Sequence, residues 1–247
     1  MIQKTGNKLV DLYDIFMDSL ARAQMNKSNL PDKIIDFEPM WSCPKMRHFL
    51  NNLCSHEEVV YFECGVARGS TLISALYDNN TTAYACDLWL EEKLGTGSRD
   101  IFNQNCEQFS ENLKKSNMTF FNGSCWDIVE QHQDKFSPKP NVFFYDAGHS
   151  IEDHRRAVSH FLPVLSDDFL MIVDDFADHR VCSGTLQGLD QLVKSDDVRL
   201  INSVQLLGIP PHAFIWNEGD RKPETTWSDN ERWGNGIWIG LFRKSRD

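Results

Sequence analysis

The chain has 247 residues, of which 41% are hydrophobic and 25% are charged. This length and composition exclude a disordered or low-complexity protein and fit one large domain, or one domain with additions. The 25 lysines and arginines stand against 36 acidic residues, and the net charge of −11 argues against nucleic acid or an anionic membrane as a partner.

No apolar run reaches the roughly 18 to 20 residues that a membrane span needs, and the N-terminus is too polar for a signal peptide. The seven cysteines include no CxxC pair, and several lie inside strand-like runs such as YFECG. This pattern is typical of reduced, buried thiols. We therefore expect a soluble, cytoplasmic protein.

The first 58 residues predict two or three amphipathic helices. In the segment KLVDLYDIFMDSLARA, apolar residues recur at helical spacing, namely Leu9, Leu12, Ile15, Phe16 and Leu20. We interpret residues 1–58 as a helical cap that packs on the main domain, residues 59–247.

From residue 59 onward, short apolar runs alternate with helix-like segments. Strands are expected at 59–63, 82–87, 118–122, 141–146 and 169–174, each followed by a helix, at 69–78, 100–116, 126–133, 150–165 and 184–194. Such uniformly apolar strands are typical of a parallel sheet covered by helices on both faces. Two final strands, 198–208 and 236–244, follow, the last of them antiparallel. The prediction is an α/β fold with a doubly wound, mostly parallel seven-stranded sheet.

The first predicted strand ends in a glycine turn, Glu63-Cys-Gly65-Val-Ala-Arg-Gly69-Ser70. Ligands of open parallel sheets bind at the carboxyl ends of the strands, and glycines let the backbone approach a ligand closely. The second strand ends in Asp87, whose carboxylate can accept hydrogen bonds from both hydroxyls of a ribose. The turn lacks GxGxxG, so the pattern favours a nucleoside ligand without a pyrophosphate. The alternative is an ordinary tight connection between a strand and a helix.

These features, together with the segment Gly123-Ser124-Cys-Trp126-Asp127 after the third strand, resemble the class I S-adenosylmethionine-dependent methyltransferases, from about residue 59 to 244. The resemblance implies a Rossmann-like methyltransferase fold with S-adenosylmethionine as cofactor. It also implies the cofactor-binding residues: Glu63, Gly65, Gly69 and Ser70 around the methionine end, Asp87 at the ribose, Ser124 and Trp126 at the adenine, and Asp146 at the edge of the site.

Three carboxylates follow the next two strands. The fourth strand ends in Asp146 and the fifth in Asp174 and Asp175. Parallel neighbours end side by side, so we expect these groups to converge, and close carboxylates repel one another unless a cation such as Mg²⁺ accepts their oxygens. The pattern is similar to the divalent-metal O-methyltransferases of the catechol and macrolide-sugar types, which implies Mg²⁺ bound by Asp146, Asp174 and Asp175. The alternative is that these residues cap the following helices.

His149 lies three residues after Asp146 and is the first candidate for a general base, because an imidazole titrates near neutral pH. His154 and His179 compete for this role, and a purely structural role for His149 stays open.

The resemblance implies methyl transfer to a hydroxyl of a small molecule with vicinal oxygens, such as a sugar, a catechol or a natural product. Substrate contacts are expected from 36–48, 91–100 and 208–236, and the last of these, a predicted lid, carries Trp216, Trp227 and Trp233. Two alternatives stay open: a methyltransferase-fold enzyme that works without metal, and a non-catalytic cofactor-binding or scaffold protein. A homo-oligomer also stays open.

Overall fold

A computed structural model describes residues 4–35, 42–90, 97–206 and 233–245. Most of the expected lid, including Trp216 and Trp227, and parts of the other two expected substrate loops lie outside the described residues. Among the described residues, no helix is both long and apolar enough to cross a membrane.

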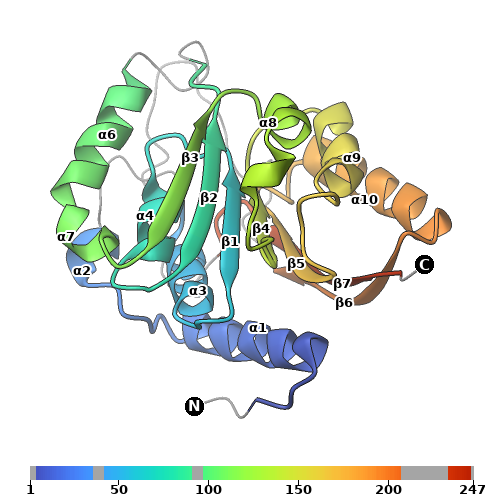
Figure 1. The fold of residues 1–247 in the computed structure, drawn as a ribbon, viewed down its shortest axis with the longest axis horizontal. Helices are drawn as coiled ribbons and strands as arrows, with labels where there is room; N and C mark the ends of the chain where they lie inside the picture. The colour runs from blue at the N-terminus through green and yellow to red at the C-terminus, as the bar shows by residue number, and fades with distance from the viewer. Residues whose placement is uncertain (1–3, 36–41, 91–96, 207–232, 246–247) are drawn as a thin grey trace.

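The seven strands form a single sheet in the order β3-β2-β1-β4-β5-β7-β6 (Figure 1). The first five pair in parallel, whereas β7 is antiparallel to both of its neighbours. The predicted doubly wound sheet with a closing antiparallel strand is confirmed. The strands are β1 (Val60–Cys64), β2 (Thr82–Asp87), β3 (Asn117–Asn122), β4 (Val142–Tyr145), β5 (Asp168–Val173), β6 (Val198–Leu206) and β7 (Ile237–Lys244).

Two hydrophobic cores lie on opposite faces of the sheet, because successive strand residues point to opposite sides. Tyr61 belongs to the core that contains α1, α3 and α4, and its neighbour Phe62 belongs to the core under α8, α9 and α10. The helices are α1 (Lys8–Gln24), α2 (Asp32–Ile35), α3 (Pro44–Cys54), α4 (Ser70–Leu76), α6 (Ser98–Gln108), α7 (Ser110–Leu113), α8 (Cys125–Gln131), α9 (Ile151–His160) and α10 (His179–Lys194).

The N-terminal helices pack directly on the sheet. The predicted apolar stripe of α1 is largely buried, and Phe16 contacts Phe49 of α3 at a ring distance of 6.1 Å. The ring of Phe49 in turn lies 6.0 Å from the ring of Trp233, which precedes β7. Of the three tryptophans expected in the lid, Trp233 is the one that the structure describes. Helices α1 and α3 therefore form part of one helical layer beside α4.

Several elements differ from the expectation in their exposure or bounds. The third strand was expected to be buried on both faces, but it lies at the edge of the sheet, and Met118 is exposed there. The helix expected at 100–116 is two helices, with Phe109 between α6 and α7. Helix α9 ends before Pro163, and α10 begins at His179, where the Asp178 side chain accepts a hydrogen bond from the Arg180 amide.

Candidate active site at the carboxyl ends of β1, β4 and β5

The glycine turn after β1 presses against the chain that leaves β4. Gly65 has a φ of +91°, and a Cβ atom at this position would lie 1.8 Å from the carbonyl oxygen of Asp146. Gly69 has a φ of +92°, and a Cβ there would lie 2.9 Å from the ring of Phe102. Both glycines are thus required by the backbone and by the close approach of neighbouring groups.

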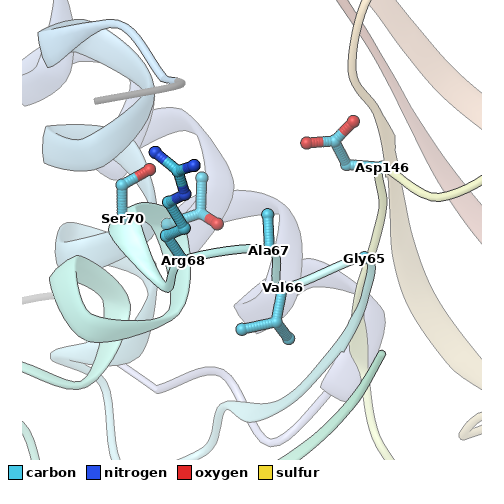
Figure 2. A pocket seen from close by; sticks show the side chains of 7 residues that line it. Gly65, Val66, Ala67, Arg68, Ser70 and Asp146 are labelled. Atoms are coloured by element: carbon cyan, nitrogen blue, oxygen red, sulfur yellow. The ribbon is translucent and has the colours of Figure 1, made fainter. Parts of the chain in front are cut away.

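A small hollow opens above this turn (Figure 2). Arg68 and Ser70 stand on one side of it, and the Asp146 carboxylate lies across from them. The hydroxyls of Ser70 and Ser42 lie 2.9 Å apart, which connects the turn to the residue two positions before α3. The lining residues are Gly65, Val66, Ala67, Arg68, Ser70, Thr71 and Asp146. Four of the predicted cofactor-binding residues therefore lie together: Gly65, Ser70 and Asp146 line the hollow, and Gly69 shapes its turn.

The Asp87 carboxylate faces the protein backbone. It accepts hydrogen bonds from the amide of Ala67 at 2.8 Å and from the amide of Trp89 at 2.6 Å. Only 8% of the residue is exposed. Asp87 therefore braces the glycine turn, and its contact with a ribose stays a prediction.

Glu63 is fully buried below the hollow. Its carboxyl group accepts hydrogen bonds of 2.6 Å from the hydroxyls of Tyr61 and Thr71. Desolvation raises the pKa of Glu63 to about 8, although both hydrogen bonds favour the charged form. Since Thr71 lines the hollow and Glu63 does not, Glu63 contacts the site through Thr71.

Ser124 and Trp126 have structural partners. Ser124 caps α8 by accepting a hydrogen bond from the Trp126 amide. The Trp126 ring stacks on Phe161 at 5.7 Å, and the Arg156 guanidinium lies 4.5 Å from the centre of the ring. These contacts fix the indole against α9, and the predicted role of both residues at an adenine stays untested.

A cluster of three potential metal ligands lies next to the hollow. Donor atoms of Asp146, His149 and Asp175 all lie within 4.8 Å of one another. The His149 Nε2 atom is 3.4 Å from Oδ1 of Asp146 and 3.5 Å from Oδ2 of Asp175. Asp146 belongs to both the hollow and the cluster. Two of the three predicted metal ligands, Asp146 and Asp175, are thus brought together.

The third predicted ligand, Asp174, is not part of this cluster. Its Oδ1 accepts a hydrogen bond of 2.9 Å from the Asp175 amide, and Asp175 itself has a φ of 56°. Asn235 donates a hydrogen bond of 2.7 Å from Nδ2 to the other oxygen of Asp175, Oδ1. Asn235 could not be expected here from the sequence, because no local pattern links it to a residue sixty positions earlier.

The charges of the cluster act on one another. Burial raises the pKa of Asp146 to about 6. The pKa of Asp174 is raised well above its usual range by burial and by the negative charges of Asp146 and Asp175. The hydrogen bond that His149 donates to Asp146, together with the negative charges of Asp146 and Asp175, raises the pKa of His149 to about 9. His149 therefore holds its proton at neutral pH, which opposes the role of a general base.

The competing histidines are less suited to that role. His154 is buried with Nδ1 3.5 Å from the Thr185 hydroxyl, and desolvation lowers its pKa to about 4. The His179 side chain is 89% exposed at the start of α10 and lies beside Asp178.

One family model matches part of the chain. The family model described as a methyltransferase domain matches residues 62–176, a segment that includes the glycine turn and the ends of β4 and β5. No curated protein sequence matches the chain.

Solved structures with this fold share little sequence with the chain. The O-methyltransferase from Bacillus cereus in complex with SAH has 13% identity and a TM-score of 0.51, covering 98% of this chain and 92% of its own. TomG from Streptomyces achromogenes, an O-methyltransferase of tomaymycin synthesis in complex with SAM, has 13% identity and a TM-score of 0.51, covering 93% and 90%. A putative RNA methyltransferase from Pyrococcus horikoshii has 12% identity and a TM-score of 0.50, covering 94% and 100%. These likenesses show the fold.

Proposed function

We propose that this protein is an S-adenosylmethionine-dependent O-methyltransferase that acts on a small molecule with a second oxygen next to the accepting hydroxyl. The observation that carries the proposal is the double position of Asp146, which lines the hollow above the glycine turn and also belongs to the cluster with His149 and Asp175. A methyl donor in the hollow and an acceptor at the cluster would then be neighbours.

Methyl transfer breaks a sulfur–carbon bond and forms an oxygen–carbon bond in line with it, and the acceptor hydroxyl gives up its proton. In this proposal Gly65 and Thr71 shape the floor for the donor, and Asp146 stands between donor and acceptor. The positively charged sulfonium is attracted to the acidic edge of the site. His149 stays the predicted base, but it must first lose the proton that Asp146 stabilises.

The donor set of the cluster fits a divalent cation. Two carboxylate oxygens and one imidazole nitrogen lie within 4.8 Å of one another. Such groups bind divalent metals in proteins. When bound, the cation would supply a Lewis acid that lowers the pKa of the acceptor hydroxyl and orients it. Asp146 and Asp175 would hold it, and Asp174 would support Asp175 by accepting a hydrogen bond from its backbone amide. The cation predicted from the sequence is Mg²⁺.

A small molecule is favoured over RNA as the acceptor, although one solved structure with this fold is described as a putative RNA methyltransferase. RNA-binding surfaces neutralise phosphates with lysine and arginine, whereas this chain has a net charge of −11 and an acidic cluster at its candidate site.

Calorimetry with S-adenosylhomocysteine tests the donor site, and transfer of a labelled methyl group to catechols, hydroxy acids and sugars tests the acceptor. We expect saturable binding of S-adenosylhomocysteine at 1:1 stoichiometry, and methyl transfer that EDTA abolishes and added divalent cation restores. Absence of binding would contradict the assignment of the hollow. Full activity in excess EDTA would instead favour the metal-independent alternative.

A further inference from the structure

We infer that His149 is a direct ligand of the divalent cation, so that the site selects transition-metal ions such as Mn²⁺ and Co²⁺ over Mg²⁺. The inference rests on the proposed function, because it concerns the ligand set of the same site. It assigns to His149 a role other than the general base predicted from the sequence, and it replaces Asp174 by His149 as the third ligand.

The distances around His149 suit shared coordination, because its contact with Asp146 is a long hydrogen bond and its contact with Asp175 lies beyond the usual hydrogen-bond length. Its Nε2 lies 3.4 Å from Asp146 Oδ1 and 3.5 Å from Asp175 Oδ2, whereas good N–H···O hydrogen bonds span about 2.7 to 3.2 Å. Two ligand atoms that are each about 2.1 Å from one metal ion, at angles of about 90° to 110°, lie about 3.0 to 3.5 Å apart. The His149 Nε2 atom thus lies at the distance expected between two ligands of one metal ion, both from Asp146 Oδ1 and from Asp175 Oδ2.

The local backbone presents Asp175 to the cluster. The left-handed φ of 56° at Asp175 turns this residue away from the direction of β5, and the carboxylate of Asp174 accepts the amide hydrogen of that strained peptide. Asn235 holds Oδ1 of Asp175, which leaves Oδ2 on the side of His149. The Asp174 carboxylate therefore stabilises the turn, and the His149 imidazole is the third member of the cluster.

The donor atoms then determine which ions bind. Oxygen ligands suit Mg²⁺, while an imidazole nitrogen suits Zn²⁺, Co²⁺ and other first-row transition ions, whose affinity for mixed sites generally rises from Mn²⁺ to Co²⁺. A site with one nitrogen and two oxygens should therefore bind Mn²⁺ more tightly than Mg²⁺, by about tenfold or more. Replacing the imidazole by a carboxylate should reverse much of this preference.

The test uses the full chain freed of metal, titrated with MnCl₂ and with MgCl₂ by calorimetry. The Mn²⁺-loaded protein is also measured by electron spin echo spectroscopy, which detects a nitrogen nucleus bound directly to Mn²⁺. The variants are His149→Gln and His149→Asp, with His179→Gln as the matched control, since His179 is exposed and outside the cluster. Far-ultraviolet circular dichroism checks that each variant is folded.

We expect a nitrogen signal in the parent and in His179→Gln and none in the two His149 variants. The ratio of Mn²⁺ to Mg²⁺ affinity should fall at least fivefold in His149→Asp. A nitrogen signal that persists in folded His149→Gln, or an unchanged affinity ratio in His149→Asp, would overturn the inference. S-adenosylhomocysteine binding is measured on the same samples: cofactor binding without a nitrogen signal refutes only the ligand role, whereas absent cofactor binding refutes the proposed function.

Discussion

The carbonyl oxygen of Asp146 occupies the space where a side chain at Gly65 would begin, 1.8 Å from the ideal Cβ position. This close approach brings the chain that leaves β1 against the chain that leaves β4. The side chain of Asp146 lines the hollow and belongs to the cluster with His149 and Asp175, so a change at Gly65 acts on both features at once.

Gly65→Ala should therefore be severely destabilising. The new methyl group would meet backbone atoms that cannot rotate away, and the positive φ adds strain, so we expect a loss of roughly 3 kcal/mol or more in the free energy of unfolding. Gly6→Ala is the matched control, because Gly6 has a φ of +80° with no other atom within 4 Å of its Cβ position. Urea unfolding measures both. A similar small loss in the two variants would contradict the close contact.

Asp87→Asn should weaken both stability and cofactor binding. An amide nitrogen would replace one oxygen that now accepts from Ala67 or Trp89, leaving a buried backbone amide without its acceptor at a cost of about 1 to 3 kcal/mol. Calorimetry with S-adenosylhomocysteine and urea unfolding should both show the loss. Asp134→Ala, in the short exposed 3-10 helix Gln133–Lys135, is the control. Weaker binding at unchanged stability would instead assign Asp87 to the ribose alone.

Glu63→Gln should change how stability depends on pH. The folded-state pKa of about 8 exceeds the usual value of 4.5, so the folded protein retains this proton to higher pH than the unfolded chain does. The resulting stabilisation is complete below about pH 4.5 and is lost as the pH rises through about 8. The variant cannot ionise, so its stability relative to the parent should rise by about 4 kcal/mol between pH 5 and pH 8.5.

Unfolding at a series of pH values measures this difference, and Glu57→Gln at an exposed position is the control. Parallel stability curves for Glu63→Gln and the parent would show that Glu63 is ionised across the whole range. Both partners of the carboxyl group, Tyr61 and Thr71, carry hydroxyls that can donate to or accept from the new amide.

Gly184→Ala tests the packing of α10 on α9. Alanine gains about 1 kcal/mol of helix propensity over glycine, but its Cβ would lie 2.3 Å from the carbonyl oxygen of Ile151 and 2.8 Å from Cβ of His154. We expect the clash to prevail, with a net loss of about 1 to 3 kcal/mol in urea unfolding. Leu186→Ala, at an exposed position of the same helix, should change stability by only about 0.5 kcal/mol. A stabilised Gly184→Ala would mean that the two helices can separate without cost.

The sequence predicts much of this fold because apolar runs and their spacing report burial directly. The same signal places Asp146, Asp174 and Asp175 at strand ends, since each carboxylate follows a buried run. It does not show that β3 lies at the edge, because strand order depends on contacts between distant segments.

The direction of each acidic side chain was also beyond reach of the sequence. Whether Asp174 or Asp175 faces the cluster depends on a left-handed backbone turn and on a hydrogen bond from Asn235, which arrives from the loop before β7. Likewise, the sequence does not show that the amides of Ala67 and Trp89 donate hydrogen bonds to Asp87, because they approach its carboxylate only in the folded turn.

The place of β7 in the sheet also bears on the order in which the chain folds. Among the strands that the structure describes, β6 pairs with β7 alone, and β7 connects it to β5. The segment from Val198 to Leu206 therefore cannot join the sheet until Ile237 to Lys244 has paired with Asp168 to Val173, across a long separation in sequence. Closing such long loops is slow. During synthesis on the ribosome, we expect the parallel part of the sheet, β1 to β5, to form first, while β6 stays unpaired until β7 has been synthesised.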